Sequence, residues 1–390
     1  MPPVTPAQGS LVMVGGALRR DNDVVWQRIV QLAGGRGAPM AVLASASANP
    51  KASAASVVDA LNRAGAQAFF VPLAVRLPDT DYRQIAVDPE WVERVAAAKG
   101  VFFTGGDQGR ITQALRTPDG ANTPMLDAVW KVYRAGGVIA GTSAGTAIMS
   151  TVMFHDAMPV LATLKAGVGR SGVMAPGLGF LGPDVFADQH LLVRGRFARM
   201  LPAMLAHGYK LGVGVDENTA AVVTGGSQIE IIGYKGALVV DMSEARSVSK
   251  TAVLDVRNVK LSYLGRGDRY DLKTKSLSLA TDKAQRKLDA SKPSRKSVRL
   301  YPDILANTTV VDLMQGLIDS AQPEAVGLAF SGSDEPQSEL GFEFRFRKGP
   351  DSAAYDTGTM GGEDNTVLNV YLDVRPVDVA TPLYQVRAAP

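Results

Sequence analysis

Val138-Ile-Ala-Gly-Thr-Ser-Ala-Gly-Thr146 is an apolar run that stops at a serine held between two glycines. Within it, Gly141-Thr-Ser-Ala-Gly145 fits the G-x-S-x-G pattern of a nucleophile elbow, in which a strand turns sharply into a helix and exposes the serine hydroxyl. Small residues permit the tight turn, and the backbone N–H after the serine points where an oxyanion could form. The stretch therefore predicts a strand, an elbow and a helix, with Ser143 as a candidate nucleophile.

On the N-terminal side of the elbow, short apolar runs alternate with amphipathic helical patterns. The predicted strands are residues 11–14, 41–44, 68–71, 101–103 and 138–140, with helical patterns near 24–32 and 53–64. This order is typical of a mainly parallel sheet with helices on both faces, so we expect an α/β doubly wound fold. In such sheets the chemistry gathers at the carboxyl ends of the strands, where Gly15-Gly16, Ser45, Gly105-Gly106 and Ser143 fall.

After about Leu211 the pattern changes. Four closely spaced strands, residues 211–215, 220–223, 228–232 and 237–240, predict an antiparallel meander. Residues 281–299 are rich in Lys and Arg, which indicates a solvated linker or exposed helix, with a basic docking surface as the alternative. Beyond them we expect a helix at 312–318 and half-exposed antiparallel strands at 341–347 and 366–374. We therefore divide the chain into a catalytic domain (1–280), a basic linker (281–300) and a small C-terminal α+β extension (301–390).

The composition is that of a soluble globular protein with a sizeable core. The 390 residues are 46% hydrophobic and 20% charged, and the net charge of +3 is too small to argue for nucleic acid. No apolar run approaches the roughly 20 residues that span a membrane. The absence of cysteine excludes thiol nucleophiles and cysteine-ligated metals, and the three histidines lack the spacing of metal ligands. We expect no metal, no cofactor, and no nucleic-acid or membrane partner.

A serine nucleophile needs a base, and the base needs an acid to orient it. His190 lies between polar neighbours in Ala187-Asp-Gln-His-Leu191, which favours a site residue. His155 is interpreted as a loop or surface residue, and His207 as a residue at a helix end, where it favours the dipole. Asp216-Glu217 follows an apolar run and is either an ordinary turn or the source of the orienting acid.

Two further motifs admit two interpretations each. Thr104-Gly-Gly-Asp-Gln108 follows an apolar run, and its glycines allow a backbone amide to serve as an oxyanion donor. The same residues also suit a plain turn in which Asp107 caps a helix. Arg194, Arg196 and Arg199 follow His190; they are either solvated or bind substrate carboxylates through their bidentate forks.

Taken together, these motifs resemble the cyanophycinases of peptidase family S51. Phe102–Gln108, Gly141–Gly145, Asp188-Gln-His190 with the three arginines, and Gly214–Ala220 occur in the order seen in that family. Leu261–Arg269 resembles the end of its catalytic domain, so the resemblance covers roughly residues 8 to 275. It implies a fold like that of class I glutamine amidotransferases.

The resemblance also implies the roles of individual residues. Ser143 matches the nucleophile, His190 its general base and Glu217 the acid that orients the imidazole, while the amides of Gly106 and Ala144 match the oxyanion donors. The order Ser, His, Glu differs from the order Ser, Asp, His of α/β-hydrolases, which weakens a lipase interpretation. The residues that match the family's substrate pocket are Gln108, Asp188, Gln189, Arg194, Arg196 and Arg199. Asp188 would meet a substrate guanidinium, and the arginines would meet its carboxylates.

The family substrate is cyanophycin, a polyaspartate that carries arginine on each β-carboxyl through an isopeptide bond. The implied activity is a serine exopeptidase that releases β-aspartyl-arginine dipeptides through an acyl-enzyme on Ser143. The alternatives are an S51 peptidase for other aspartyl peptides, α-linked or isoaspartyl, and a catalytically silent binding protein. The length of the chain resembles secreted bacterial cyanophycinases, so we expect an extracellular protein, with the cytoplasm as the alternative. The C-terminal extension would support a homodimer, bind the polymer or simply extend the fold.

Overall fold

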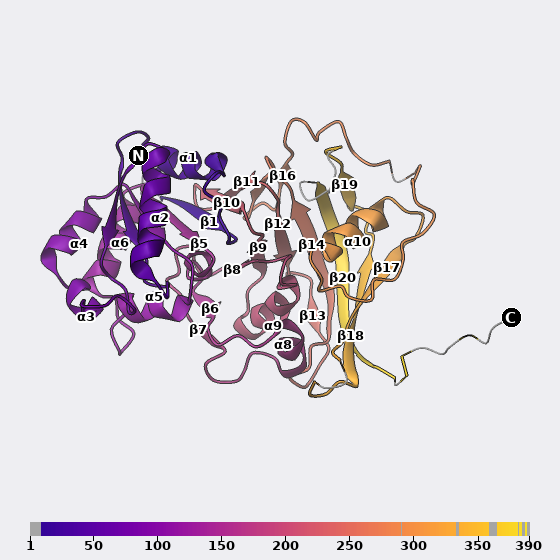
Figure 1. The fold of residues 1–390 in the computed structure, drawn as a ribbon. Helices are drawn as coiled ribbons and strands as arrows, with labels where there is room; N and C mark the ends of the chain where they lie inside the picture. Colours follow the sequence, from indigo (N-terminus) through magenta and orange to yellow (C-terminus); the bar gives the residue numbers. More distant parts are fainter. Residues whose placement is uncertain are drawn as a thin grey trace, which may run out of the picture.

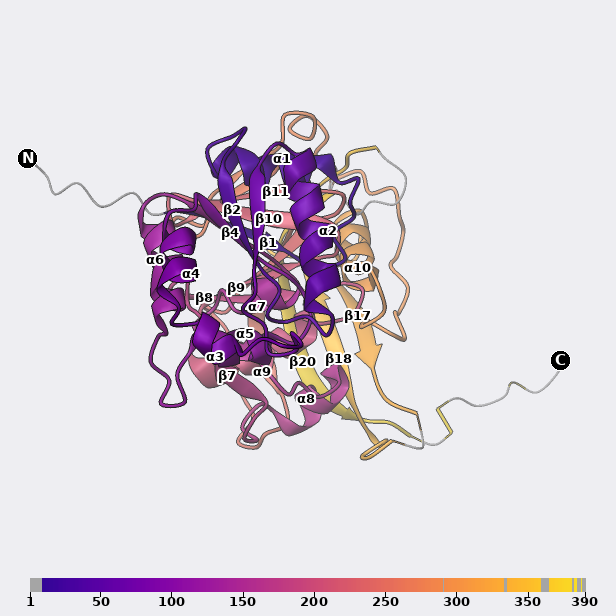
Figure 2. The ribbon, with the colours of Figure 1, turned by 60° about the vertical axis from the view of Figure 1, so that its left-hand side comes forward.

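The computed structural model describes residues 9–289, 291–332, 335–358, 365–380, 382–383 and 387. In this part of the chain two large sheets stand side by side. The helix-covered parallel strands lie on the left of Figure 1, and the second sheet, with the C-terminal strands, lies on the right. Figure 2 shows the parallel strands and the covering helix α2 from a direction turned by 60°. No helix in these residues is long and apolar enough to cross a membrane.

The first sheet is parallel in its N-terminal half. Its strands in spatial order are β16 (Leu277–Ser278), β15 (Arg269–Asp271), β11 (Gln228–Gly233), β10 (Thr219–Thr224), β1 (Ser10–Val14), β5 (Val138–Thr142), β4 (Gly100–Phe103), β2 (Pro39–Leu43) and β3 (Gln67–Val71). The pairs from β1 to β3 are parallel, whereas β10, β11, β15 and β16 are joined by antiparallel pairs. The predicted α/β doubly wound fold is therefore confirmed.

The helices begin where the sequence supplies capping residues. They are α1 (Asp23–Leu32), α2 (Pro50–Arg63), α3 (Tyr82–Ile85), α4 (Pro89–Ala96), α5 (Gln108–Leu115), α6 (Pro124–Arg134), α7 (Ala144–Ala147), α8 (Val160–Ala166), α9 (Phe197–His207) and α10 (Thr309–Ile318). Asn49, Asp88 and Thr123 each accept a hydrogen bond from the first turn of the helix they precede, and a proline follows each of them. A polar cap followed by proline is a favourable helix start, because proline lacks only an N–H that the first turn leaves unpaired.

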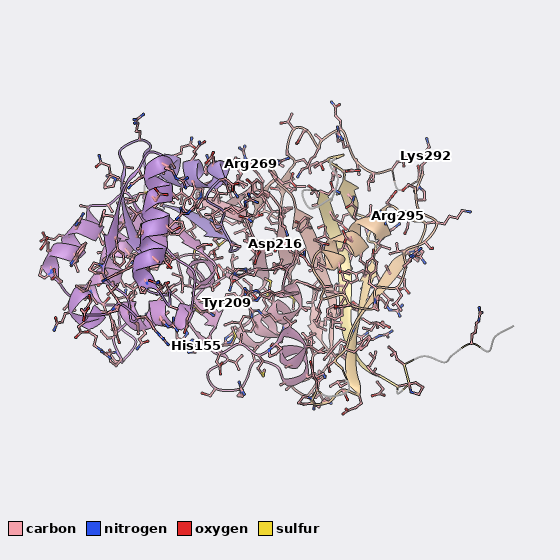
Figure 3. The ribbon with its side chains drawn as sticks, viewed as in Figure 1. His155, Tyr209, Asp216, Arg269, Lys292 and Arg295 are labelled. Carbon is pink, nitrogen blue, oxygen red and sulfur yellow. The ribbon has the colours of Figure 1, made fainter. Side chains whose placement is uncertain are left out.

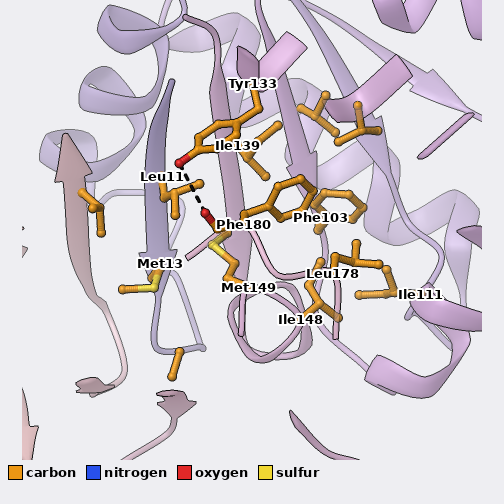
Figure 4. Packing of buried hydrophobic residues seen from close by; sticks show 14 of the residues in the cluster. Leu11, Met13, Phe103, Ile111, Tyr133, Ile139, Ile148, Met149, Leu178 and Phe180 are labelled. Atoms are coloured by element: carbon orange, nitrogen blue, oxygen red, sulfur yellow. Dashed lines mark hydrogen bonds between the residues drawn. The ribbon is translucent and has the colours of Figure 1, made fainter. Parts of the chain in front are cut away.

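Apolar clusters bury both faces of the first sheet. Neighbouring residues of β1 alternate between them: Val12 packs with α1 and α2, and Leu11 packs with α4 and α6. Figure 4 shows part of the cluster that contains Leu11, in which the Tyr133 hydroxyl donates a hydrogen bond to the Phe180 carbonyl over 3.3 Å. Burial on both faces explains why these strands are continuous apolar runs.

The second sheet is antiparallel except at one edge. Its strands in spatial order are β17 (Glu324–Ala329), β18 (Leu340–Arg347), β20 (Thr366–Asp378), β14 (Val256–Leu264), β12 (Ala237–Asp241), β9 (Leu211–Val215) and β8 (Val185–Gln189), with β13 (Arg246–Ser247) on β14 and β19 (Ala353–Tyr355) on β20. Only the β8–β9 pair is parallel in this sheet of the described residues. A separate ribbon joins β6 (Val152–Phe154) to β7 (Met174–Pro176).

The strands between residues 211 and 241 are antiparallel, but the predicted single meander is wrong. β9 and β12 pair in the second sheet, whereas β10 and β11 pair in the first. The chain therefore crosses between the sheets at residues 216–218 and again at 234–236. All of β9 and most residues of β10, β11 and β12 are buried. Buried strands have similar apolar patterns in both sheets, so the sequence does not indicate which sheet each strand joins.

The C-terminal strands extend the second sheet. β20 pairs with β14 along most of its length and with β18 on its other side. Phe342, Phe344 and Phe346 of β18 are all buried, which fits the predicted alternation of that strand. In the preceding segment, residues 281–289 and 291–299 form no helix, and most of their side chains are exposed. Lys283 is an exception, because it is buried and forms an ion pair with Asp268 over 3.2 Å.

Candidate active site

Ser143 occupies a strained elbow between β5 and α7. Its backbone has φ +54° and ψ −110°, a combination that costs a residue other than glycine about 1–3 kcal/mol. Hydrogen bonds hold the elbow closed: Ser143 N–H donates to the Val14 carbonyl over 3.0 Å, and the Thr146 hydroxyl lies 2.7 Å from the same oxygen. The predicted strand, elbow and helix are therefore present.

Both glycines of the elbow are required by close contacts. A Cβ at Gly141 would overlap the backbone of Gly145, and a Cβ at Gly145 would overlap the Phe103 carbonyl at the end of β4. The G-x-S-x-G pattern thus reflects the packing of the elbow on β4 and on its own helix.

His190 links the elbow to a carboxylate. Its Nε2 lies 2.8 Å from Ser143 Oγ, and its Nδ1 lies 2.6 Å from Glu217 Oε1. A carboxylate only accepts hydrogen bonds, so Nδ1 of His190 carries the proton. Nε2 of His190 can then accept a hydrogen bond from the Ser143 hydroxyl. The three side chains form one hydrogen-bonded chain in the order expected of a nucleophile, a base and an orienting acid.

The first sheet fixes the position of the His190 imidazole. His190 N–H donates to the Gly15 carbonyl over 2.7 Å. A Cβ at Gly16, where φ is +120°, would overlap the imidazole ring itself. Gly16, noted in the sequence only as part of a strand end, therefore leaves the space in which the imidazole lies, whereas Gly15 allows the close approach of the Asp216 backbone.

Burial tunes the basicity of His190. Its side chain is 9% exposed, and burial lowers the pKa of the imidazole below its usual value. The hydrogen bond to Glu217 acts in the opposite direction, and the nearby cations Arg194 and Arg196 lower the pKa further. The neutral imidazole needed by a general base is therefore favoured at neutral pH.

The adjacent carboxylates Asp216 and Glu217 have different surroundings. Glu217 reaches His190 and keeps 27% of its side chain exposed. Asp216 is fully buried, lies 3.1 Å from Lys235 Nζ and accepts a hydrogen bond from Leu192 N–H. Figure 3 shows Asp216 between the two sheets. Asp216 therefore connects Lys235 and the backbone of Leu192, whereas Glu217 is the acid that contacts the imidazole.

The loop before α5 lies against the elbow. A Cβ at Gly105 would come within 3.3 Å of Ser143 Cβ, and one at Gly106, where φ is +140°, would overlap the Ala46 carbonyl. Asp107 caps α5 by accepting a hydrogen bond from Gly109 N–H over 2.9 Å. Both interpretations of this motif are thus compatible, because a helix cap follows a glycine loop beside Ser143. Ala144 opens α7 directly after the nucleophile.

Of the residues assigned to the substrate pocket, Gln189 contacts Ser143 directly. Gln189 Oε1 is 3.4 Å from Ser143 Oγ, and Gln108 donates to the Phe154 carbonyl over 2.7 Å. Arg196 donates to the Gln189 carbonyl over 3.1 Å. Burial, followed by repulsion from Arg199, lowers the pKa of Arg196 to about 10, so the side chain keeps its charge at neutral pH.

Asp188 and Arg199 differ from the expectation. Both are buried, and the Arg199 guanidinium holds both Asp188 oxygens at 2.7 and 2.6 Å. Arg199 also lies over the Phe154 ring, 4.2 Å from its centroid. The carboxylate expected to meet a substrate guanidinium is therefore occupied by Arg199, because α9 packs against β8. Because Asp188 also accepts the Gln189 N–H over 2.9 Å, the pair positions the segment that carries His190.

The other histidines lie outside this hydrogen-bonded chain. His155 is exposed just after β6, low in the middle of Figure 3, and packs against Gly109. His207 is the last residue of α9 and is followed by Gly208 in the left-handed conformation, as its predicted place at a helix end requires. Arg194 is exposed beside the site.

One neighbour of the site had no signal in the sequence. Gly195, between Arg194 and Arg196, has φ +58°, and a Cβ there would lie 2.5 Å from the Leu305 carbonyl of the C-terminal extension. The C-terminal extension therefore packs against residues 194–196, which we call the arginine loop. No motif around Leu305 could have indicated this contact.

Comparison with known proteins identifies relatives of this chain. A model of peptidase family S51 matches residues 44–232. The cyanophycinase of Geminocystis herdmanii is 34% identical over 275 residues, which cover 68% of this chain and 95% of that protein. The cyanophycinase of Thermosynechococcus vestitus is 30% identical over 277 residues, covering 68% of this chain and 80% of that protein. Among solved structures, a peptidase from an acI-B1 Actinobacterium is 19% identical with a TM-score of 0.47, over 60% of this chain and 91% of that one.

The family match and the relatives of 30–34% identity define the molecule as a peptidase. More particularly, the chain belongs to peptidase family S51, and it is similar to the cyanophycinases over about two thirds of its length.

Proposed function

We propose that this peptidase hydrolyses cyanophycin through an acyl-enzyme on Ser143 and releases β-aspartyl-arginine dipeptides. The observation that carries the proposal is the hydrogen-bonded chain from Ser143 through His190 to Glu217. The proposed substrate follows from the relatives that are cyanophycinases, which match this chain at 30–34% identity.

In the first half-reaction, Ser143 Oγ attacks the carbonyl carbon of the scissile amide while His190 Nε2 takes the hydroxyl proton. The imidazolium that forms donates its Nδ1–H to Glu217. The amides of Gly106 and Ala144 are assigned to the negative oxygen of the tetrahedral intermediate. His190 Nε2–H then gives its proton to the leaving amine, the C–N bond breaks, and the acyl group stays on Ser143.

In the second half-reaction, water replaces the amine. His190 Nε2 takes one proton from water as its oxygen attacks the ester carbonyl, and returns that proton to Ser143 Oγ when the ester bond breaks. The balance is one water consumed and one amide converted into a carboxylic acid and an amine. No redox partner or cofactor is required for these steps.

Substrate charge supports the choice of polymer. Each unit of cyanophycin presents a free arginine carboxylate, and Arg196 keeps its charge beside Gln189, the neighbour of Ser143. Arg194 adds an exposed cation on the same loop. Guanidinium forks match carboxylates in geometry as well as charge. We assign these two arginines to the substrate carboxylate, with the buried Arg199 acting only through Asp188.

Digestion of purified cyanophycin, with the products identified by mass, tests the proposal. The wild type is expected to release β-aspartyl-arginine, Ser143→Ala to release none above background, and the matched control Ser56→Ala on α2 to match the wild type. Release of arginine-free aspartyl products from other peptides, with none from cyanophycin, would favour a different aspartyl substrate. A folded wild type that cleaves neither would favour a binding protein on this scaffold.

A further inference from the structure

A groove of about 970 Å³ lies beside the candidate site and is not used by the mechanism above. Its walls come from α3 and the segments on either side of it, from α5 and the turn after it, and from the edge of β7. We propose that this groove binds the units of the polymer that continue from the unit at Ser143, through their free arginine carboxylates. The inference rests on the proposed function and adds a second binding surface to it.

The groove and the site share a wall. Asp107 and Gly109 line the groove, whereas Gly105, two residues earlier, packs against Ser143. Between them, Gln108 donates its hydrogen bond to the Phe154 carbonyl. The loop before α5 and its first turn therefore connect Ser143 to the groove along the chain.

The β6 ribbon makes the same connection from the other side. Phe154 lies under the Arg199 guanidinium, in contact with the buried pair that positions His190. The next residue, His155, lines the groove and packs on Gly109. Two consecutive residues thus link the buried Asp188–Arg199 pair behind the site to the wall of the groove.

The charge of the groove is one-sided. Four arginines line it: Arg76, Arg83, Arg110 and Arg116. Among the lining residues the only carboxylate is Asp107, and it is already engaged by Gly109 N–H and by Arg110 Nε at 3.5 Å. The groove therefore offers more cationic donors than its single carboxylate can pair with.

Two of these arginines are available to a ligand. Arg76 and Arg83 are exposed, and neither forms an ion pair within the described residues. Arg83 lies over the Tyr82 ring, 4.7 Å from its centroid, which holds the guanidinium near the groove. Arg116, in contrast, donates to the Gly120 and Gly177 carbonyls and shapes the groove floor. Arg76 and Arg83 are thus the residues that would recognise a ligand.

Cyanophycin complements this arrangement. Each of its units carries one carboxylate close to the backbone and one guanidinium at the end of a flexible chain. Arginine forks bind the carboxylates in a bidentate manner, whereas like charge directs the substrate guanidinium groups towards solvent. The volume of the groove lies at the upper end of the range of about 300–1,000 Å³ found for small-molecule sites, so it has room for more than one side chain.

The test compares a long and a short substrate in an Arg76→Glu/Arg83→Glu double variant. The matched control is Arg36→Glu/Arg63→Glu, which makes the same charge change at exposed arginines outside the groove. The ratio of kcat/KM for soluble polymer to kcat/KM for the two-unit fragment is measured for each protein. The groove variant is expected to lower this ratio about tenfold through the KM for polymer, and the control to leave it unchanged.

A binding measurement separates this inference from the proposed function. In a Ser143→Ala background, cosedimentation with insoluble cyanophycin is expected to weaken with the groove substitutions and not with the control substitutions. If the polymer-to-fragment ratio of kcat/KM and the cosedimentation are the same for groove and control variants, the groove does not bind the polymer. The proposed activity would not be affected by that result. A wild type that neither binds nor cleaves cyanophycin overturns both proposals.

Discussion

The two sheets contribute different parts of the candidate site. Ser143 follows β5 of the first sheet, whereas His190 and Glu217 follow β8 and β9, which are parallel neighbours in the second. The bond from His190 to Glu217 therefore stays within one sheet, while the bond from His190 to Ser143 crosses between the two. The second sheet supplies the carboxylate that contacts the imidazole, whereas Gly15 and Gly16 of the first sheet hold the imidazole near Ser143.

The support behind each half also differs. The elbow of the first sheet is held by its own glycines and by β4. The arginine loop of the second sheet rests on Leu305 of the C-terminal extension, and Phe197 at the start of α9 packs against Phe344 of β18 at 5.8 Å between ring centroids. The first half is thus self-contained, whereas the second half relies on residues distant in the sequence.

The largest effect should come from the acid within the second sheet. Glu217→Gln removes the charge that stabilises the imidazolium, so kcat should fall about 10³- to 10⁴-fold, with little change in the midpoint of thermal unfolding. The neighbouring Asp216→Asn is the contrast: it breaks a buried ion pair with Lys235 and should lower the free energy of unfolding by about 3 kcal/mol. Equal losses of kcat in both folded variants would contradict the assignment of Glu217.

The next effect tests the contact between the sheets. In Gly16→Ala the new methyl group would overlap the His190 ring, and displacing a base by about 1 Å costs about 10²-fold in kcat. Gly34→Ala is the matched control, because Gly34 also has a positive φ but nothing lies within 4 Å of the added Cβ. Steady-state kinetics that show similar kcat for the two variants would mean that the first sheet does not hold the imidazole.

A smaller effect tests the support from the C-terminal extension. Gly195→Ala combines an unfavourable φ with a collision against Leu305, so it should lose about 1–2 kcal/mol of stability and raise KM several-fold. Gly208→Ala has the same sign of φ and open space around its Cβ, and so shows the backbone cost alone. The free energy of unfolding, from denaturant titration, and KM are measured for both variants. Equal values for Gly195→Ala and Gly208→Ala would contradict a role for the contact between Gly195 and Leu305.

The smallest effect concerns pH. Because the positive charge of Arg194 lowers the pKa of His190, Arg194→Gln should raise it. The acid limb of kcat/KM, which reports the free enzyme, should therefore move to higher pH. Arg36→Gln serves as the control, since it removes an exposed charge elsewhere. An acid limb that stays in place or moves to lower pH would show that Arg194 does not act on the imidazole.

Much of the first sheet was readable from the sequence because its signals are local. Continuous apolar runs mark β1 to β5, and the small residues around Ser143 mark the elbow. The start of α2 was predicted near Ser53 and lies at Pro50, because Asn49 caps the helix and proline follows it. Such caps shift an element boundary without changing the pattern of buried residues.

The parts that sequence could not supply depend on packing between segments far apart in the chain. Spacing alone left Asp216 and Glu217 equivalent, and the family resemblance chose Glu217; the structure separates them through Lys235 and His190. Asp188 and Arg199 are polar and close in sequence, which suits a substrate pocket, yet burial pairs them with each other. The distribution of β9 to β12 between two sheets was likewise invisible, since buried strands have similar patterns in both.

The most direct test of the account is the labelling of Ser143 by a fluorophosphonate, with the modified peptide identified by mass. The wild type should carry the label on Ser143, and His190→Ala, checked for folding by circular dichroism, should react at least 10²-fold more slowly because the hydroxyl loses its base. Labelling of another serine, or an equal rate in His190→Ala, would contradict a nucleophile in the first sheet that is activated from the second.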